Sequence, residues 1–409
     1  MERFRLGLIA DDLTGALDTG VQFQQKGLTT VVPFKYGRSF QDVGVVAFNS
    51  NTRHEKREVA FRRVFQLTRR LKGRILFKKV DSTLRGNVAA EIMAMLEASG
   101  LHKAILAPAF PTQGRTLEEG ILKFYGTPFH RTAYREAFSP PLDTSFVPEL
   151  MERGLGEKVG HLGREALKHG PLKLSERIRG ARERVILVDS CNRRDLRLIG
   201  QAWWSFLRDE ALICGSAGLA KEIDLGEPPR RTTPFRMRRK KGPLLLVSGS
   251  RHEKTLNQVR RVLKVLGFPL VEPDMADFTN PLKSAQEIRK VARLVGDALD
   301  RSKGVVLSTS FREMVKGNED QVAQSLGKVV GHVLRRHEIS SLILSGGDVA
   351  MEVCQNLRSG GMRIETEILQ GIPLSSLLDG PWKGLPIVTK GGGLGDPNAF
   401  LEVIHYLTG

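Results

Sequence analysis

The chain has 409 residues, more than one compact domain of about 100 to 200 residues ordinarily holds, so its length predicts two domains. Its 41% hydrophobic and 26% charged residues are typical of a globular protein and exclude a disordered chain. The net charge of +18 suggests nucleic-acid binding as one alternative, but only 6% of the residues are aromatic, which argues against a platform that stacks single-stranded bases.

The first half of the chain alternates short apolar runs with helical patterns, which is typical of a parallel sheet covered by helices. Helices are predicted after Asp12, over residues 55–71, and after Asn87, which is a candidate N-cap. Between residues 127 and 180 the periodicity weakens, and no architecture is predicted there. Strands are predicted at residues 4–10, 29–34, 43–48, 74–80, 104–107, 185–188 and 211–214.

The second half repeats this rhythm after a basic, proline-containing stretch that is typical of a linker. We therefore expect domains at residues 1–228 and 243–409, joined by a basic linker at residues 229–242. The expected fold class is α/β, with two domains that each carry a largely parallel sheet flanked by helices, and with the active site in the cleft between them. Strands of the second half are predicted at residues 244–247, 304–307, 341–344 and 385–388.

Charged and hydroxyl side chains follow the predicted strands of the first half. Ligands of open α/β sheets bind at the carboxyl ends of the strands, so we expect these side chains to line one site. Arginine offers a planar fork to a carboxylate and aspartate accepts hydrogen bonds from hydroxyl groups, which favours a small, polyhydroxylated anion as the ligand. The residues are Asp11, Asp12, Arg53, Asp81, Ser82, Thr83, Leu84, Arg85 and Arg115.

Some of these residues have simpler interpretations. Asp12 is also suited to cap the helix that follows it, and an isolated Arg53 is more often a surface residue. Two adjacent aspartates after a buried strand need partners, which favours a binding site. Of Lys78 and Lys79 only one can share the face of the site, because side chains alternate along a strand, and we select Lys79.

The strands of the second half end in loops of small residues. Glycine permits the close backbone approach that a phosphate nest needs, so a nucleotide site is predicted here. The G-x-x-x-x-G-K-[ST] and G-x-G-x-x-G fingerprints are absent, and a lone glycine triplet is also compatible with a flexible turn. The loops are Ser248-Gly249-Ser250, Ser345-Gly346-Gly347-Asp348 and Lys390-Gly391-Gly392-Gly393-Leu394-Gly395.

Taken in chain order, these motifs resemble those of the four-carbon acid sugar kinases, over nearly the whole chain. Two positions depart from the family pattern: Arg251-His252 follow the first loop where the family more often has Cys or Ser, and Leu394 stands where it often has an aromatic residue. The resemblance rests on residues 10–16, 78–87, 108–111, 114–116 and 215–220, and on the three loops above with Thr255 and Gln258.

The resemblance implies an ATP-dependent kinase that phosphorylates a tetronate, such as erythronate or threonate, or a 3-oxo-tetronate, to give the 4-phosphate. The first domain would bind the small sugar acid, and the second would bind ATP. By motif, the acid would contact Asp12, Arg53, Asp81, Ser82, Thr83 and Leu84, and ATP would contact Ser250, Gly346, Gly347, Gly391, Gly392, Gly393 and Leu394.

Position and charge add Asp11, Lys79 and Arg85 to the expected substrate-binding residues. Asp12 is expected to be catalytic, orienting the terminal hydroxyl and accepting its proton late in the reaction. Mg²⁺ is expected to bridge the phosphate oxygens, and its protein ligands are unknown.

Other functions stay open. One is a kinase of the same fold that acts on a different small hydroxy acid, and another is the basic nucleic-acid-binding protein, which steeply salt-dependent binding to DNA or RNA would reveal. A metal-dependent phosphatase that uses the Asp11-Asp12 pair is disfavoured because that chemistry wants carboxylates two residues apart.

The location and assembly of the protein follow from weaker signals. No apolar run approaches the roughly 18 to 20 residues of a membrane span, and the first residues lead into a strand rather than a signal-peptide core. The three cysteines lie far apart without metal-ligand spacing, as expected for reduced thiols. We expect a cytoplasmic protein without a membrane partner, and the sequence is compatible with a homodimer.

Overall fold

The computed structural model describes residues 6–34, 43–71, 73–138, 141–225, 241–311 and 318–409. The chain divides into two compact units: unit 1 comprises Met1–Leu28 and Phe40–Arg230, and unit 2 comprises Thr29–Ser39 and Arg231–Gly409. Most of the predicted linker at residues 229–242 lies outside the described residues, which resume at Lys241. Unit 2 thus takes a short segment from the first half of the chain, which the expected boundaries assign to the first domain.

Unit 1 is built on a sheet in which each neighbouring pair of strands is parallel. The strands are continuous apolar runs because helices cover both faces of the sheet, and every residue of its central strands Leu6–Ala10 and Ala211–Gly215 is buried. In spatial order the strands are β3 (Val45–Asn49), β1 (Leu6–Ala10), β4 (Ile75–Lys79), β11 (Ala211–Gly215), β5 (Lys103–Ala107), β10 (Val185–Val188) and β9 (Gly160–Leu162).

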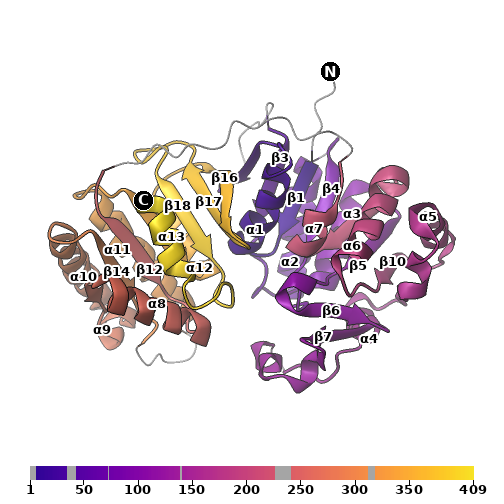
Figure 1. Ribbon diagram of the computed structural model, residues 1–409, viewed down its shortest axis with the longest axis horizontal. Coiled ribbons are helices and arrows are strands. Elements are labelled where there is room, and N and C mark those ends of the chain that lie inside the picture. The colour runs from indigo at the N-terminus through magenta and orange to yellow at the C-terminus, as the bar shows by residue number, and fades with distance from the viewer. Residues whose placement is uncertain (1–5, 35–42, 72, 139–140, 226–240, 312–317) are drawn as a thin grey trace. The chain divides into compact units, whose positions relative to one another are not determined.

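The helices of unit 1 pack in two groups, both of which contact β1 and β11 (Figure 1). One group contains α1 (Leu13–Gln24), α7 (Ala217–Glu222), α6 (Arg193–Ala202) and α5 (Gly170–Gly180). The other contains α2 (Arg57–Arg70), α3 (Val88–Ser99) and α4 (Val147–Leu155). A small antiparallel sheet of β6 (Arg115–Glu118), β7 (Ile121–Phe124) and β8 (Thr127–Pro128) was not predicted.

Unit 2 has a mixed sheet, parallel from β13 to β18 and antiparallel beyond. Its last strand, β2, comes from the first half of the chain and pairs with β16, a long-range contact that no local pattern predicts. The order is β13 (Leu270–Val271), β14 (Gly304–Ser308), β12 (Leu244–Ser248), β15 (Ser341–Ser345), β18 (Pro386–Lys390), β17 (Ile372–Leu377), β16 (Gly361–Leu369) and β2 (Thr30–Pro33).

The helices of unit 2 also form two packed groups (Figure 1). α8 (Glu253–Leu266) and α13 (Ala399–Thr408) contact each other and share a buried core with the sheet that includes Leu246, Ile343, Val388 and Phe400. The second group contains α9 (Met275–Thr279), α10 (Ser284–Leu299), α11 (Glu319–Leu334) and α12 (Gly347–Asn356).

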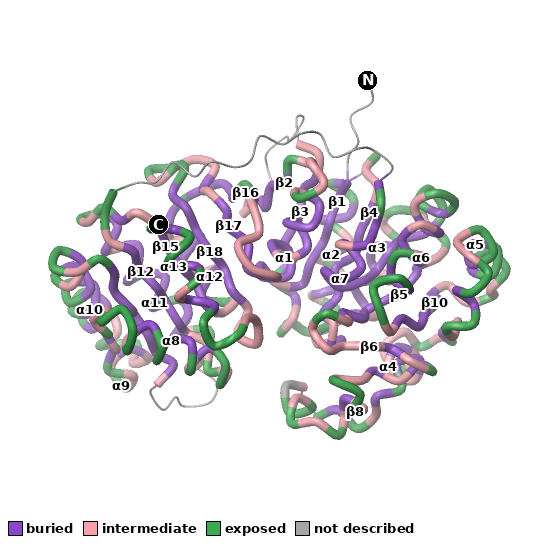
Figure 2. The backbone as a smooth tube through the Cα atoms, viewed as in Figure 1, coloured by how far each residue is buried: buried purple, intermediate pink, exposed green. Residues whose placement is uncertain are grey.

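Figure 2 shows that the strands of both main sheets are mostly buried, whereas exposed residues lie largely on helices and loops. The expected α/β fold class is confirmed, because most neighbouring strands are parallel and helices flank them, and each predicted strand is present within two residues of its expected ends. Over the described ranges, no helix combines the length and the apolar character needed to cross a membrane.

Candidate functional site

Three neighbouring strands of unit 1, β3, β1 and β4, end beside one another and carry predicted acid-binding residues. Asp11 and Asp12 directly follow β1, Arg53 lies in the loop after β3, and Lys79 is the last residue of β4. The backbone N–H of Thr52 donates to the carbonyl of Asp11 at 3.0 Å. This bond holds the loop after β3 against the end of β1, and so places Arg53 beside the two aspartates.

Arg53 binds both aspartates through its guanidinium group. Its Nε and Nη2 donate to the two carboxylate oxygens of Asp11, each at 2.8 Å, and its Nη1 donates to Oδ2 of Asp12 at 2.6 Å. Burial alone would raise the pKa of Asp11, but Arg53, together with Lys78 and Lys79, outweighs burial and holds that pKa below its usual range. These bonds use three of the five guanidinium N–H groups, which leaves two for a ligand.

Asp12 is both a helix cap and a partner of Arg53. Its Oδ1 accepts a hydrogen bond from the backbone N–H of Gly15 at 2.7 Å, in the first turn of α1. Asp12 therefore caps α1 and also belongs to the charged cluster, as the two interpretations of its sequence position predict. Each carboxylate oxygen has one donor here and keeps lone-pair capacity for a hydroxyl group.

The loop after β4 is organised around the carboxylate of Asp81. Arg85 donates to it from Nε at 2.7 Å and from Nη2 at 3.1 Å, and the hydroxyl of Thr83 donates to it as well. Burial would raise the pKa of Asp81, but Arg85 and Arg53 outweigh it and hold the pKa well below its usual range. Ser82 lies in the same turn and is partly exposed.

Two residues of this loop have positive φ angles, 63° at Leu84 and 87° at Gly86. A Cβ atom at Gly86 would lie 3.0 Å from Oδ2 of Asp11 and 3.4 Å from Cα of Arg53. The loop therefore packs directly against the Arg53–Asp11 pair, and the unusual backbone of Leu84, which a non-glycine residue rarely adopts, is maintained by this packing. The structure thus brings Asp11, Asp12, Arg53 and the turn of residues 81–85 into one cluster, whereas Arg115 lies over the ring of Phe124 in the small antiparallel sheet.

Lys79 lies over the first turns of α1, with its Nζ 3.0 Å from the position of a Cβ at Gly15. Burial opposes its charge, but Asp18 and Asp12, followed by Asp11 and Asp81, raise its pKa. Asp18 was not predicted as a site residue. Burial raises its pKa to about 6, and the signal for it in the sequence is a carboxylate in a helix whose flanking residues are otherwise apolar or small.

Lys78 lies on the other side of β4. Its Nζ forms an ion pair with Oε2 of Glu91 at 2.8 Å and donates to the carbonyl of Ile9 at 3.2 Å, with both charged side chains almost fully buried. Asn87 stands at the N-cap position of α3, as predicted, but its side chain makes no cap bond and instead donates to the carbonyls of Thr52 and Glu55. Both contacts stabilise the strands and loops that carry the cluster.

In unit 2, the carboxyl ends of four adjacent strands, β14, β12, β15 and β18, lie at the same level. The pairing register aligns Ser308 with Ser248, Ser248 with Ser345, and Ser345 with Lys390. The loops that follow are joined by backbone hydrogen bonds, including one from Gly346 N–H to the carbonyl of Lys390 at 3.1 Å. The predicted nucleotide-binding loops therefore meet at one edge of this sheet.

These loops approach one another closely because they lack side chains. A Cβ at Gly392 would lie 2.4 Å from Oγ of Ser250, and one at Gly346 would lie 3.8 Å from the backbone nitrogen of Ser250. His252, one of the two departures from the family pattern, caps α8 and lies beside Gly392 and Gly393. A side chain at residue 392 would require the side chain of Ser250 to move.

The remaining predicted residues lie at the ends of the same loops. Gly347 is the first residue of α12, and the carbonyl of Gly391 accepts a hydrogen bond from the backbone N–H of Leu394 at 3.1 Å. The side chain of Leu394, the second departure, lies against Gly371 in the turn between β16 and β17.

The unit 2 loops fit a phosphate-bearing ligand. Ser345 directly precedes Gly346, and its buried Oγ has no hydrogen-bond partner among the described residues. The N-termini of α8 and α12 also lie at this edge, where free backbone N–H groups favour anions. Within the described part of the chain no group of three or more His, Cys, Asp or Glu side chains is placed to hold a metal ion.

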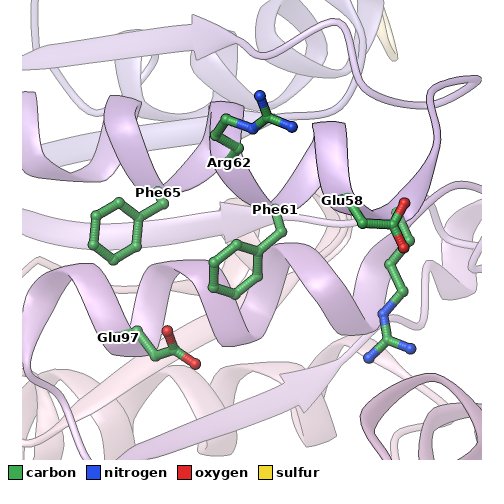
Figure 3. Close-up of a pocket in the computed structure, with 6 residues that line it drawn as sticks. Glu58, Phe61, Arg62, Phe65 and Glu97 are labelled. Carbon is green, nitrogen blue, oxygen red and sulfur yellow. The ribbon is translucent and has the colours of Figure 1, made fainter.

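A separate groove of about 580 Å³ lies between α2 and α3 (Figure 3). Phe61 and Phe65 stack on each other at 6.1 Å between ring centres, and Glu97 faces them from α3. The groove contains none of the predicted site residues.

Comparison with known proteins gives two matching family models. A sugar-binding N-terminal domain matches residues 6–223, more than half of the chain, and a nucleotide-binding C-terminal domain matches residues 245–400. The first model covers the acid-binding cluster of unit 1, and the second covers the glycine-containing loops of unit 2.

Curated relatives are similar over nearly their full length. A D-threonate kinase of Salmonella typhimurium is 29% identical, covering 98% of this chain and 97% of the relative. A 3-oxo-tetronate kinase of Cupriavidus necator is also 29% identical, covering 99% and 97%. A crystal structure from Salmonella typhimurium LT2, described as a putative tRNA synthase, has a TM-score of 0.80 at 22% identity and covers 98% of both chains, which shows the shared fold.

The predicted resemblance to the four-carbon acid sugar kinases is thus confirmed by the names of the relatives. The chain belongs to the family defined by the sugar-binding N-terminal domain, followed by the nucleotide-binding C-terminal domain.

Proposed function

We propose that the protein is an ATP-dependent kinase that transfers a phosphoryl group to the terminal hydroxyl of a four-carbon sugar acid, a tetronate or 3-oxo-tetronate, to give the 4-phosphate. Unit 1 would bind the acid and unit 2 would bind ATP. The observation that carries the proposal is the cluster of Asp11, Asp12, Arg53 and Lys79 at the carboxyl ends of adjacent strands. The kinase relatives support the same assignment.

The cluster suits an acid that carries hydroxyl groups. Arg53 keeps two N–H groups beyond its bonds to the aspartates, and the buried ammonium group of Lys79 supplies a second positive charge for the substrate carboxylate. The carboxylates of Asp12 and Asp81 would accept hydrogen bonds from the hydroxyl groups. Ser82, Thr83, Leu84 and Arg85 would complete the contacts through the turn after β4.

In the reaction, the oxygen of the terminal hydroxyl forms a bond to the γ-phosphorus of ATP, and the bond from that phosphorus to the β,γ-bridging oxygen breaks, releasing ADP. The hydroxyl proton passes to Asp12. A weak base suffices, because the transition state of phosphoryl transfer is loose and the proton leaves late. Most of the catalysis then comes from positioning the two substrates.

Unit 2 would hold the phosphates with backbone N–H groups of the loops that contain Ser250, Gly346, Gly347 and residues 391–394. When bound with ATP, Mg²⁺ would neutralise charge on the phosphate oxygens. The expected cytoplasmic location and the homodimer stay predictions.

A phosphatase that uses the aspartate pair as nucleophile and acid is not favoured by the geometry. Arg53 binds both oxygens of Asp11 and one of Asp12, and the last oxygen caps α1. A carboxylate held in this way by a guanidinium fork is a weaker nucleophile, because attack would break charge-assisted hydrogen bonds.

The test is ADP release from ATP and Mg²⁺ with a panel of acids: both erythronates, both threonates and the 3-oxo-tetronates, with glycerate and five-carbon acids as length controls. We expect turnover with at least one four-carbon acid and little with the controls. Turnover confined to a three- or five-carbon acid would refute the substrate class, and silence across the panel would refute the proposed activity.

A further inference from the structure

Lys390, the last residue of β18, lies beneath the glycine loop of unit 2 and is only 1% exposed. Its Nζ lies 2.9 Å from the carbonyl oxygen of Gly391, 3.2 Å from that of Leu394 and 3.0 Å from the hydroxyl oxygen of Thr255. Thr255 in turn donates its own hydroxyl hydrogen to the carbonyl of Gly392 at 2.8 Å.

This arrangement is complementary to an ammonium group rather than to a neutral amine. All three near neighbours of Nζ act as acceptors toward it, because two are carbonyls and the Thr255 hydroxyl has its hydrogen committed elsewhere. An ammonium group has three donors and no acceptor, so it matches the three nearest sites one for one, and the carbonyl of Gly392 lies farther away at 3.5 Å. The ring of Phe400, 5.2 Å from Nζ, adds a cation–π contact.

The same side of the loop is held by a second residue. Gln258 donates from Nε2 to the carbonyls of Leu394 at 3.1 Å and Asp396 at 2.6 Å. The carbonyls of four loop residues, Gly391, Gly392, Leu394 and Asp396, are therefore fixed toward α8 and Lys390. A phosphate nest needs this orientation.

What Lys390 lacks is a counter-charge. In the described part of the chain no carboxylate forms an ion pair with it, and the one charged group that acts on it strongly is another cation, Lys254. A buried charge without an opposite charge is costly, so burial and Lys254 oppose the ammonium form that the surrounding acceptors favour, and an anion bound beside the loop would shift this balance toward the ammonium form. In agreement, burial together with Lys254 lowers the pKa of Lys390 to about 7.

We propose that Lys390 is the positioning residue of the glycine loop and that nucleotide phosphates supply its counter-charge, so that nucleotide binding draws a proton from solvent onto its Nζ. This inference rests on the proposed nucleotide site. It adds to that site the uptake of one proton from solvent when the nucleotide binds. The other ionisable groups of the adjoining loops and helix N-termini include Arg251, His252 and Lys254 at the start of α8, Asp348 in the first turn of α12, and Asp396, whose Oδ1 accepts from the backbone N–H of Asn398.

The test is calorimetric titration of ADP at pH 8.0 in two buffers with different ionisation enthalpies, which gives the number of protons taken up. At this pH the nucleotide phosphates are fully ionised, so uptake reports on the protein. We expect the wild-type protein to take up most of one proton per ADP bound. We also expect its Kd to rise about tenfold from pH 7.5 to 8.5, because the protonated fraction of a group with a pKa near 7 falls about tenfold over that interval.

Two variants separate the sources of the proton. Lys390→Met should abolish the uptake, whereas His252→Gln should retain it. Lys390→Arg, which stays charged at all these pH values, should bind ADP without uptake and without the rise in Kd. Uptake that persists in Lys390→Met would overturn the proposal by assigning the proton to another group.

The wild-type measurement decides the case even if the Lys390 variants do not fold. ADP binding by the wild-type protein without proton uptake would overturn the role of Lys390 and leave the proposed kinase function untouched. Absence of ADP binding by the folded wild-type protein would overturn the nucleotide site itself, and with it both proposals.

Discussion

Replacement of Asp12 by Asn is expected to lower kcat by about 10²- to 10⁴-fold, the usual range for loss of a proton-transfer group. The amide can keep the cap on α1, because its oxygen still accepts from the backbone N–H of Gly15. It cannot accept the proton of the substrate hydroxyl, and its NH₂ group faces a donor of Arg53. The measurement is steady-state kinetics with the acid that turns over, varying each substrate in turn.

The ATP KM should change little in Asp12→Asn, because the predicted ATP contacts belong to the other unit. The matched control is Asp209→Asn, an exposed carboxylate of unit 1, which should turn over normally. Near-normal turnover by folded Asp12→Asn would remove Asp12 from the catalytic role.

Replacement of Arg53 by Met is expected to cost unit 1 about 3–5 kcal/mol of unfolding free energy at pH 7, because it leaves two partly or fully buried carboxylates without their charged partner. The Arg53 side chain is 13% exposed and that of Asp11 is 3% exposed, so water can solvate the orphaned carboxylates only poorly. The measurement is denaturant unfolding followed by a probe in unit 1, since a two-unit chain need not unfold in one step.

The deficit should shrink in acid. The pKa of Asp11 is lowered in the folded protein, so its pairing contributes stability above the unfolded value of about 4, and this contribution is lost as the pH falls through the folded value. The matched control is Arg179→Met, which removes an exposed ion pair with Glu210. It should leave the unfolding midpoint unchanged both at pH 7 and in acid. A loss of unfolding free energy below about 1 kcal/mol for Arg53→Met at pH 7 would contradict this prediction. It would show that water solvates the cluster as well as it solvates an ion pair on the surface.

The parallel cores of both units could be predicted because buried strands are continuous apolar runs with polar loops at their ends. The hairpin of β16 and β17 was missed because the strands were predicted from continuous apolar runs, whereas β16 is partly exposed and alternates apolar with polar residues. The pairing of β2 with β16 joins residues some 330 positions apart, which the local pattern cannot reveal.

The parts of the candidate site that could be predicted are those whose residues directly follow a predicted strand. Strand alternation allowed only one of Lys78 and Lys79 on the side of the aspartates. Lys79 was selected, and its Nζ lies over the first turn of α1, whereas Lys78 pairs with Glu91. The roles of Asp18 and Lys390 depend on what surrounds them in three dimensions. Lys390 was visible as part of a motif, but only the folded loop shows that carbonyls and a hydroxyl surround its ammonium group.

The most direct test of the central claim is proton-coupled ³¹P NMR of the product formed from ATP and a four-carbon acid. Transfer to the terminal hydroxyl predicts a new phosphomonoester signal split into a triplet by the two C4 protons, formed in step with ADP. A doublet would place the phosphate on a secondary hydroxyl and contradict the predicted product, and formation of inorganic phosphate alone would contradict the kinase assignment.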